Sequence, residues 1–475
     1  MHLVVAVLDV AFAAWAVVLV AVLAAAAGAA AVLRSTPARR KHVVVLVLGD
    51  IGHSPRMQNH ALSLARNGFT VDLVGFGESA PRRELAESGA VRLVHLPAPS
   101  RIRSRSRIAY ALLGLVRAAS QSARLLWLLL RVLPKPEFVV VQNPPAIPTL
   151  AIAQLVSAAL GARLVIDWHN FGFSLMPPRL TRNALLRGIL AGYERLAGRS
   201  AFLHLCVTEA MAHELRSRWR VRGQVVVLYD KPTPNFAPLS PAAIHELLER
   251  IDFDAHDLSY RPEPCLPLQQ TLLTRRAGNS RIELRPDRPA IVISSTSWTP
   301  DEDFDLLLDA LLMYDAKASA SDLSQLVIII TGKGPLKDAF MARLAKHRLT
   351  HVSIKFGWLL PVDYPRMVAA ANLGVSLHTS SSGLDLPMKI IDMFGCGVPA
   401  CSFRYPAISE LVQDGVNGAL FSDASELCER LVTLLGAFPS SADKLAALAR
   451  GAERFRRTSW DAHWDASVLP HLSGQ

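Results

Sequence analysis

Short apolar runs alternate with helix-length segments along most of the chain. Because Val/Ile/Leu-rich runs separated by helices are typical of βαβ units, the pattern predicts parallel sheets covered by helices on both faces. The predicted strands form two series. The first is His42–Leu48, Thr70–Phe76, Val91–Leu96, Glu137–Asn143, Ala162–Trp168 and Phe202–Thr208, and the second is Ala290–Ser295, Gln325–Thr331, His351–Phe356, Leu373–His378, Val398–Ser402 and Gly418–Phe421.

Residues 235–289 interrupt this alternation. The segment is rich in proline and charge, contains no apolar strand run, and includes one helical pattern near Ala242–Ile251. We therefore expect a linker or insertion between a first Rossmann-like domain, residues 42–234, and a second, residues 290–435. Residues 436–475 are expected to form a C-terminal helical tail. In such α/β folds two parallel-sheet domains face a cleft, and ligands bind beyond the carboxyl ends of the strands.

The longest apolar run lies near the N-terminus. Val10–Leu33 contains 24 residues without a charge, enough for a helix across about 30 Å of hydrocarbon. Basic residues follow at positions 34, 39, 40 and 41, and none precedes the run. The positive-inside rule therefore predicts a transmembrane anchor within residues 1–33 and a cytosolic remainder. A cleaved signal peptide ending in Ala24–Ala31 is the alternative, which the length and the flanking charges disfavour.

Composition narrows the class of protein. Hydrophobic residues make up 51% and charged residues 19%, which excludes a wholly disordered chain. The net charge of +11 favours an anionic partner, which could be a membrane surface, a phosphorylated substrate or nucleic acid. The five cysteines include no CxxC pair, which argues against a metal cluster or a disulfide framework and favours a reducing compartment.

The segment Ser104–Leu133 combines arginines with leucines. Arg117, Arg124 and Arg131 recur at seven-residue steps, with Trp127 among the leucines. Such a helix can lie in a membrane interface. It can equally cover a sheet with its leucines and expose a solvated basic face.

The first predicted strand ends in a turn with candidate polar groups, GDIGHSPRM (Gly49–Met57). Its two glycines allow a tight turn, and the helix that follows presents free N–H groups to an anion. The turn lacks the GxGxxG spacing of a dinucleotide site. Asp50, Gly52 and His53 are the candidate residues, although a plain strand-to-helix turn is also possible.

A histidine follows another strand of the same domain, in IDWHNFGFS (Ile166–Ser174). His169 stands just past the strand end, between Asp167 and Asn170. A histidine can act as a general base or hold a sugar hydroxyl, and a nearby carboxylate can orient it. Because catalytic groups often lie on such loops, we favour a functional histidine over a structural one.

Two turns of the second domain are suited to phosphate binding. In ITGKGP (Ile330–Pro335), the glycines let the backbone approach a pyrophosphate and the lysine supplies charge. In SSTSWTPDEDF (Ser294–Phe304), hydroxyls follow a strand and precede an acidic helix start that is also typical of N-capping. The candidate residues of these turns are Ser295, Thr296, Ser297, Gly332, Lys333 and Gly334.

An acidic pair follows in Leu377–Pro399. Asp385 and Asp392 lie seven residues apart, with Lys389 between them. Carboxylates accept two hydrogen bonds and therefore hold vicinal sugar hydroxyls well, whereas a lysine suits a diphosphate. Seven residues correspond to about two helical turns, so both carboxylates could line one side of a pocket.

Taken together, these motifs resemble those of GT-B-fold, nucleotide-sugar-dependent glycosyltransferases. Within that class they are most similar to the family of chitobiosyldiphosphodolichol β-mannosyltransferases of the dolichol pathway. The resemblance runs from about Val43 to Pro232 and from about Pro289 to Phe421. Besides the motifs quoted above, it rests on QNPPAIP (Gln142–Pro148), VTEAMAHEL (Val207–Leu215) and VLYDKP (Val227–Pro232).

The resemblance implies an inverting transfer of mannose from GDP-mannose to dolichol-diphosphate-linked chitobiose, forming its first β-1,4-linked mannose. It implies an enzyme anchored by one helix in the endoplasmic reticulum membrane, with its catalytic domain in the cytosol. The implied partners are the membrane lipid surface and other mannosyltransferases of the pathway, not nucleic acid. No cofactor and no catalytic metal are implied, because protein groups usually neutralise the leaving diphosphate in this fold.

The resemblance also assigns roles to individual residues. Asp392 matches the second acid of the family motif, which holds the ribose, and Asp385 stands near the first, which contacts the transferred sugar. The general motif has two glutamates eight residues apart, whereas this chain has aspartates seven apart. The fold family often has an Arg or Lys where this chain has Ser295–Ser297, which shifts the phosphate role to Lys333 and Lys389.

An inverting transfer needs a base that deprotonates the acceptor hydroxyl. His169 is the first candidate and Asp50 the second, while Gly52, His53 and Asn170 are candidates for acceptor binding. The alternatives are a GT-B transferase with a different lipid or sugar acceptor and a non-catalytic, membrane-anchored transferase subunit. A nucleotide-sugar epimerase would share the fold but has no evident need for an anchor.

Overall fold

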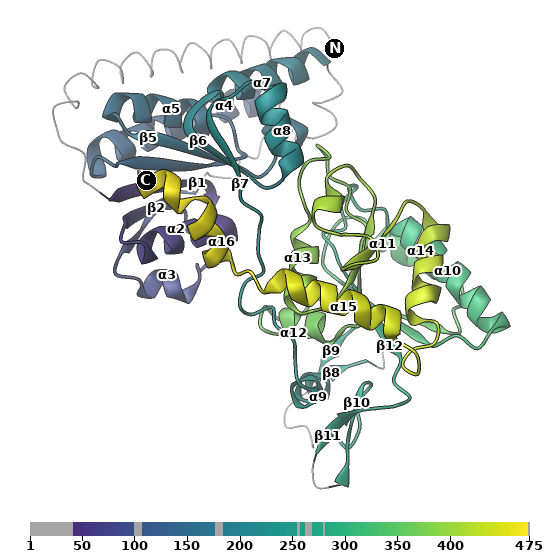
Figure 1. The fold of residues 1–475 in the computed structure, drawn as a ribbon. Coiled ribbons are helices and arrows are strands. Elements are labelled where there is room, and N and C mark those ends of the chain that lie inside the picture. The colour runs from purple at the N-terminus through teal and green to yellow at the C-terminus, as the bar shows by residue number, and fades with distance from the viewer. Residues whose placement is uncertain are drawn as a thin grey trace. The chain divides into compact units, whose positions relative to one another are not determined.

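A computed structural model of the chain describes residues 41–98, 107–175, 184–253, 257–261, 268–278 and 281–473. The described residues up to Tyr229, together with those from Trp464 onward, form one compact unit, and Asp230–His463 form a second. Each unit is built on its own parallel sheet (Figure 1). The predicted anchor, Val10–Leu33, lies outside the described residues.

The first unit contains a seven-stranded sheet in the order β3-β2-β1-β4-β5-β6-β7, with all neighbours parallel. In the middle of the sheet, residues 43–47 of β1 and residues 138–141 of β4 are apolar and buried, as expected when helices cover both sides of a sheet. The strands are β1 (His42–Asp50), β2 (Thr70–Phe76), β3 (Val91–Leu96), β4 (Phe138–Asn143), β5 (Arg163–Trp168), β6 (Ser200–Cys206) and β7 (Arg222–Val227).

Helices connect these strands and begin where the sequence provides start signals. Pro55 opens α2, and the Thr208 side chain accepts a hydrogen bond from the Met211 N–H at the start of α8. The helices are α2 (Pro55–Arg66), α3 (Arg83–Glu87), α4 (Arg107–Trp127), the π-helical turn η1 (Leu128–Val132), α5 (Thr149–Leu160), the 3-10 turn η2 (Gly172–Leu175), α7 (Ala184–Ala197) and α8 (Glu209–Ser217).

The second unit contains a six-stranded parallel sheet in the order β14-β13-β12-β15-β16-β17. Its strands are β12 (Ala290–Ser295), β13 (Leu326–Thr331), β14 (Val352–Gly357), β15 (Leu373–Ser376), β16 (Ala400–Phe403) and β17 (Gly418–Phe421). Its helices are α9 (Pro241–Arg250), α10 (Phe304–Ala320), α11 (Lys337–Leu344), α12 (Asp363–Ala370), α13 (Met388–Gly395), the 3-10 turn η4 (Ile408–Glu410), α14 (Ala424–Leu435) and α15 (Asp443–Arg456). Hydrophobic cores fill both faces of this sheet.

The end of the chain is divided between the units. The last helices are α16 (Trp460–Ser467) and α17 (Leu469–Ser473). From Trp464 onward these residues belong to the first unit, whereas α15 belongs to the second. The expected tail, residues 436–475, is therefore helical but is not one structural piece.

The predicted strands are confirmed in both series, with ends that differ by at most a few residues. The first series lacked β7, whose burial is only partial. The predicted helix in residues 235–289 is confirmed as α9, but the expectation of no strand there was wrong. The segment contains two short antiparallel pairs, β8 (Ile251–Asp252) with β9 (Ser259–Tyr260), and β10 (Thr274–Arg276) with β11 (Ile282–Leu284). Strands this short show no apolar periodicity.

The arginine-rich segment forms α4 and η1, which contact α5. Leu125 and Leu126 are buried, and Arg124, Trp127 and Arg131 are exposed. Within the described ranges, no helix combines the length and the apolar character that a membrane crossing requires.

Candidate active site

His169 follows β5 at the carboxyl edge of the first sheet, where it contacts a buried carboxylate. Its Nε2 lies 2.8 Å from Asp167 Oδ2. The Asp167 side chain is completely buried, whereas the His169 side chain is about a quarter exposed. The expected neighbour of the histidine is therefore in place, and the ring remains accessible from solvent.

Two residues of α2 hold the same carboxylate. Arg56 donates from Nε to Asp167 Oδ2 at 2.8 Å and from Nη2 to Oδ1 at 2.9 Å. His60 Nε2 lies 3.1 Å from Oδ2. Burial alone would raise the pKa of Asp167, but Arg56 and the two histidines outweigh it and hold that pKa well below its usual range. Asp167 is therefore ionised and fixed at both oxygens.

Asp50 and His53 lie in the turn between β1 and α2. The backbone N–H groups of Glu78 and Ser79 both donate to Asp50 Oδ1 at 3.1 Å. Despite some desolvation, these bonds lower the pKa of Asp50. His53 Nδ1 lies 2.7 Å from Asp50 Oδ2, on a side chain that is 79% exposed. A Cβ on Gly52 would stand 2.7 Å from the Ser79 carbonyl oxygen, so this glycine permits close loop packing.

Asn170 is buried and organises its own loop. Its Oδ1 accepts from the Phe171 N–H at 2.8 Å and from Ser174 Oγ at 3.2 Å. Glu194 of α7 fixes the same loop, because its carboxylate accepts from the Gly172 and Phe173 N–H groups. The side chain proposed for acceptor binding is thus used in shaping the loop after His169.

In the second unit, several predicted donor residues meet at a small cavity. The cavity, about 290 Å³, lies beyond the carboxyl ends of β12, β13 and β14, as expected for a ligand site in such a sheet. Its apolar wall comes from the loop after β14. Its lining residues are Ser295, Thr296, Thr331, Gly332, Trp358, Leu359, Pro361 and Tyr364.

The two glycines of the GKG turn face protein backbone. A Cβ on Gly332 would stand 1.8 Å from the Thr296 carbonyl oxygen, and one on Gly334 would stand 1.8 Å from that of Ser297. Both positions therefore require glycine so that the β13 and β12 loops can pack together. Between them, the Lys333 ammonium lies 4.7 Å from the ring centre of Trp358, at the cavity wall.

Glu302 connects the loop after β12 to α13. The sequence motifs did not identify it as a site residue. Its Oε2 accepts from Thr296 Oγ1 at 2.5 Å and from the Ser297 N–H at 3.1 Å. Its Oε1 pairs with the Lys389 ammonium. The acidic stretch of the sequence was interpreted as helix capping, which is the role of Asp303 alone. Lys389 thus reaches the hydroxyl-rich loop through a buried carboxylate.

The first acid of the pair lies in the loop before α13, together with a second unpredicted residue. Asp385 accepts hydrogen bonds from Ser380 and Ser382. His378 Nε2 lies 3.6 Å from Asp385, and its Nδ1 lies 3.3 Å from Asp301. Burial opposes ionisation of Asp385, but bonds from His378 and Ser380 lower its pKa. His378 is therefore flanked by two carboxylates at the carboxyl edge of the sheet.

Asp392 lies within α13, which begins only at Met388. The two acids are therefore not related by the two helical turns that their spacing indicated. Desolvation raises the pKa of Asp392 to about 7. Burial, and after it the charge of Asp392, raises the pKa of Tyr364, whose hydroxyl donates to Ser295 Oγ at 2.9 Å. Asp392 therefore interacts with Tyr364, which lines the cavity and bonds to Ser295 there.

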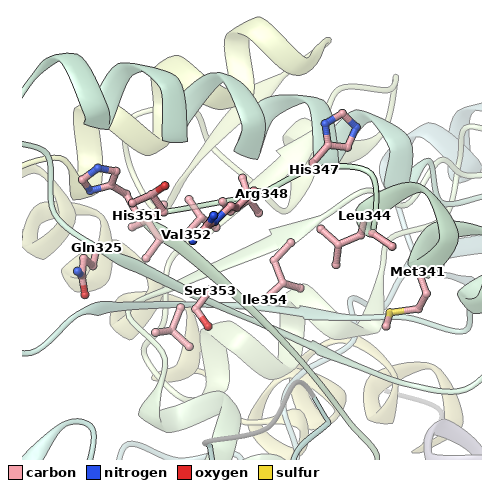
Figure 2. Close-up of a pocket in the computed structure, with 14 residues that line it drawn as sticks. Gln325, Met341, Leu344, His347, Arg348, His351, Val352, Ser353 and Ile354 are labelled. Atoms are coloured by element: carbon pink, nitrogen blue, oxygen red, sulfur yellow. The ribbon is translucent and has the colours of Figure 1, made fainter.

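A larger cavity of about 580 Å³ lies elsewhere in the second unit (Figure 2). It is lined by the starts of β13 and β14 and by the end of α11, with His347, Arg348 and His351 among its polar residues. Because it adjoins the amino ends of the strands, it lies at the opposite edge of the sheet from the predicted donor residues. In the described part of the chain, no three His, Cys, Asp or Glu side chains are grouped to hold a metal.

Known proteins match both units of the chain. Residues 51–230 match the Glycosyl transferase 4-like domain, and residues 288–437 match Glycosyl transferases group 1. Anabaena Alr3699/HepE, solved with UDP-glucose, shares the fold with a TM-score of 0.60 at 18% identity, over 91% of this chain and 99% of that one. The bacterial glycosyltransferase WaaG matches with a TM-score of 0.55 at 13% identity, over 91% and 100%.

Relatives in sequence match almost the whole chain. The UDP-glycosyltransferase TURAN of Arabidopsis thaliana is 42% identical over 92% of this chain and 98% of its own. The chitobiosyldiphosphodolichol beta-mannosyltransferases of Mus musculus and Homo sapiens are 40% and 39% identical, over 92% and 90% of this chain and 90% and 92% of theirs. The chain is a glycosyltransferase of the GT-B fold and belongs to the chitobiosyldiphosphodolichol beta-mannosyltransferase family.

Proposed function

We propose that the chain transfers mannose from GDP-mannose to dolichol-diphosphate-linked chitobiose with inversion, forming its first β-1,4-linked mannose. The names of its relatives support this acceptor and this sugar. The observation that carries the chemistry is the His169–Asp167 pair at the carboxyl end of β5. An inverting transfer needs a base, and His169 would be that base, held by the ionised Asp167.

His169 is the better base of the two candidates. Because its Nε2 faces an ionised carboxylate, the ring donates there and its Nδ1 lone pair remains available for a proton. Asp50 is a weak base, since two backbone N–H groups hold one oxygen and lower its pKa. The acceptor hydroxyl would lose its proton to His169 as it attacks the sugar carbon and the nucleoside diphosphate departs.

The second unit would bind the donor. The cavity beyond β12–β14 suits a nucleobase because one wall is apolar and the hydroxyls and backbone of the other can orient a ring. Asp392 would accept the ribose hydroxyls, and Asp385, with Gly383 and the serines around it, would face the transferred sugar. Lys333 and Lys389 would neutralise the departing diphosphate without a catalytic metal. Activity that persists in EDTA would support this last point, and activity that requires an added divalent cation would overturn it.

A direct assay tests the reaction. The full-length chain in detergent is incubated with radiolabelled GDP-mannose and a lipid-diphosphate chitobiose, and labelled lipid is extracted. His169→Gln keeps the size of the side chain but removes the base, so turnover should fall about 10²–10⁴-fold. GDP affinity should stay unchanged, because the donor residues belong to the other unit. Near-normal turnover would move the base to Asp50 or elsewhere.

The alternative is a transferase with a different donor or acceptor, which the name of the Arabidopsis relative, a UDP-glycosyltransferase, favours. Parallel incubations with UDP-glucose and UDP-N-acetylglucosamine distinguish the two. Transfer from a UDP-sugar alone would replace our proposal. Absence of transfer from any donor, together with undetectable GDP and UDP binding, would favour the non-catalytic subunit.

We further propose that Val10–Leu33 anchors the chain in the endoplasmic reticulum membrane by a single pass, with both units in the cytosol, and that α4 and α7 rest on the lipid surface. Both helices contact α5. They expose Trp127, Leu185 and Leu196, each more than 60% accessible, beside arginines such as Arg124. Aromatic and leucine side chains among arginines are typical of membrane interfaces, where each basic residue contributes about 1 kcal/mol.

Two measurements test this placement. A glycosylation tag at the C-terminus should remain unmodified in microsomes, and its modification would overturn the topology. Trp127→Ala combined with Arg124→Gln and Arg131→Gln should lower activity on acceptor in vesicles and spare a short-chain soluble acceptor. Equal losses on both acceptors would assign α4 a purely structural role.

A further inference from the structure

Trp464 of helix α16, close to the C-terminus, is joined by a hydrogen bond to the cluster that holds His169. Trp464 Nε1 lies 3.0 Å from His60 Nδ1. His60 Nε2 is in turn 3.1 Å from Asp167 Oδ2, the oxygen that His169 contacts at 2.8 Å. Trp464 and His60 are each only 1% exposed. All four residues belong to the first unit, where α16 runs beside α2 (Figure 1).

The chemistry of the indole determines the state of His60. An indole N–H can only donate, so His60 Nδ1 must accept and therefore carries no proton. The proton of the neutral ring is then on Nε2, which donates to Asp167. Burial also lowers the pKa of His60, which keeps the ring neutral. One indole N–H thus selects both the tautomer and the charge of the histidine.

Asp167 Oδ2 then receives three donors, from Arg56, His60 and His169. An oxygen atom has few lone-pair directions, so each donor constrains the angles open to the others. A His60 ring in the other tautomer would present a lone pair to this oxygen and repel it. The carboxylate, and with it His169, would then lose the present orientation.

We propose that Trp464 is a positioning residue for catalysis: it fixes the tautomer of His60, which orients Asp167 and through it the base His169. The inference rests on the proposed role of His169. By this proposal the residues from Trp464 onward, which belong to the first unit, help to position the base that acts on the acceptor. A hydrogen bond from Asn67 Nδ2 to Asp465 Oδ1 at 2.9 Å fixes α16 against the end of α2.

Hydrophobic packing alone does not require this indole N–H. Val468 and Leu472 continue the buried stripe of Trp464 at four-residue steps, and both are almost completely buried. The indole nitrogen adds a specific hydrogen-bond partner to an apolar face that α16, Val468 and α17 already form together. A phenylalanine at position 464 would keep most of that apolar contact and would remove only the donor.

The charged and titratable groups around His60 determine the expected pH effect. From α2 it faces Arg56, from β5 and its loop Asp167 and His169. The nearby Cys206 of β6 stays a neutral thiol, because burial raises its pKa to about 12. Without the indole N–H, His60 Nδ1 can take up a proton as the pH falls. A positive His60 then competes with His169 for Asp167, so the acid limb of the kcat profile should move to lower pH.

The experiment compares Trp464→Phe with wild type in the full-length chain, measuring kcat and the KM for GDP-mannose across the acid limb of the pH profile. We expect kcat to fall about tenfold, KM to stay constant and the acid limb to move to lower pH. The matched control is Val468→Ala, which weakens packing of the same end of the chain and should lower Tm without moving the limb. A shift of the limb in both variants would show a general loosening and overturn the proposal.

Two further variants keep the test decisive. In a His60→Gln background, which cannot take up a proton, Trp464→Phe should not move the limb, and a shift there would overturn the proposal. His169→Gln is measured alongside. If it abolishes turnover while Trp464→Phe matches wild type, the positioning role fails and the proposed function stands. If His169→Gln retains turnover, the proposed base is wrong, and the positioning role falls with it.

Discussion

If Asp392 holds the ribose as proposed, its protonation should make nucleotide binding depend on pH. Desolvation raises its pKa to about 7, so the carboxylate is about one-tenth ionised at pH 6 and about nine-tenths ionised at pH 8. Ribose hydroxyls donate hydrogen bonds, and the ionised carboxylate is their stronger acceptor. Binding should therefore favour the ionised form and release a proton.

The size of the effect follows from these fractions. If only the ionised form binds the ribose, GDP affinity should rise about tenfold between pH 6 and pH 8, which is about 1.4 kcal/mol. Asp392→Asn has nearly the same shape but no charge and no proton to release. It should bind GDP about 1.5–3 kcal/mol more weakly than wild type at pH 8, and the difference should shrink toward pH 6.

Isothermal titration calorimetry with GDP measures both quantities. Titrations at pH 7 in buffers of different ionisation enthalpy should show release of about half a proton by wild type. The terminal phosphate of GDP also titrates, near pH 6, but its contribution is common to both proteins and cancels in the comparison. If wild type and Asp392→Asn showed the same pH dependence, Asp392 would not be the ribose acceptor.

Two further substitutions test the buried ion pairs. Arg56→Met should lower the free energy of unfolding of the first unit by about 3–5 kcal/mol at neutral pH, because it leaves Asp167 buried and charged. The control Arg218→Met, at an exposed position, should lower it by less than about 1 kcal/mol. Thermal unfolding measures both. The pKa of Asp167 is lowered in the folded state. The loss of unfolding free energy in Arg56→Met should therefore be complete above the unfolded-state pKa of Asp167, about 3.9, and should shrink as the pH falls below that value. A loss that does not change with pH would mean that Arg56 stabilises by packing alone. Glu302→Gln should release Lys389 and tighten GDP binding about three- to tenfold at low salt, and weaker binding would show that Glu302 mainly organises the β12 loop.

The sequence predicted the strands well because their burial leaves a strong apolar signal. β12 and β2 have the predicted bounds, and their residues are buried almost throughout. β7 is an edge strand with exposed and half-buried residues, so its apolar signal is weak. The strands of residues 235–289 have only two or three residues, too few for any periodicity. The local sequence pattern thus predicts a strand where burial in the fold makes the residues of that strand uniformly apolar.

The site was predicted less completely, because its groups are joined across long distances in the chain. The sequence pointed to His169 and Asp167, but Arg56 lies 111 residues from Asp167. The spacing of Arg56 and His60, one helical turn apart on a helix that covers the sheet, was the available signal. No comparable sequence signal pointed to Glu302, because an acidic residue just before a helix is expected to cap that helix.

The charge balance around Asp167 bears directly on the choice of base. Arg56 binds both oxygens of Asp167 and balances its charge, while His60 donates as a neutral ring. The carboxylate can then orient His169 through a hydrogen bond. At Asp50, by contrast, the donors act on the proposed base itself and weaken it. The donors around Asp167 thus act on the partner of the proposed base, whereas those around Asp50 act on the alternative base itself, which favours the proposal for His169.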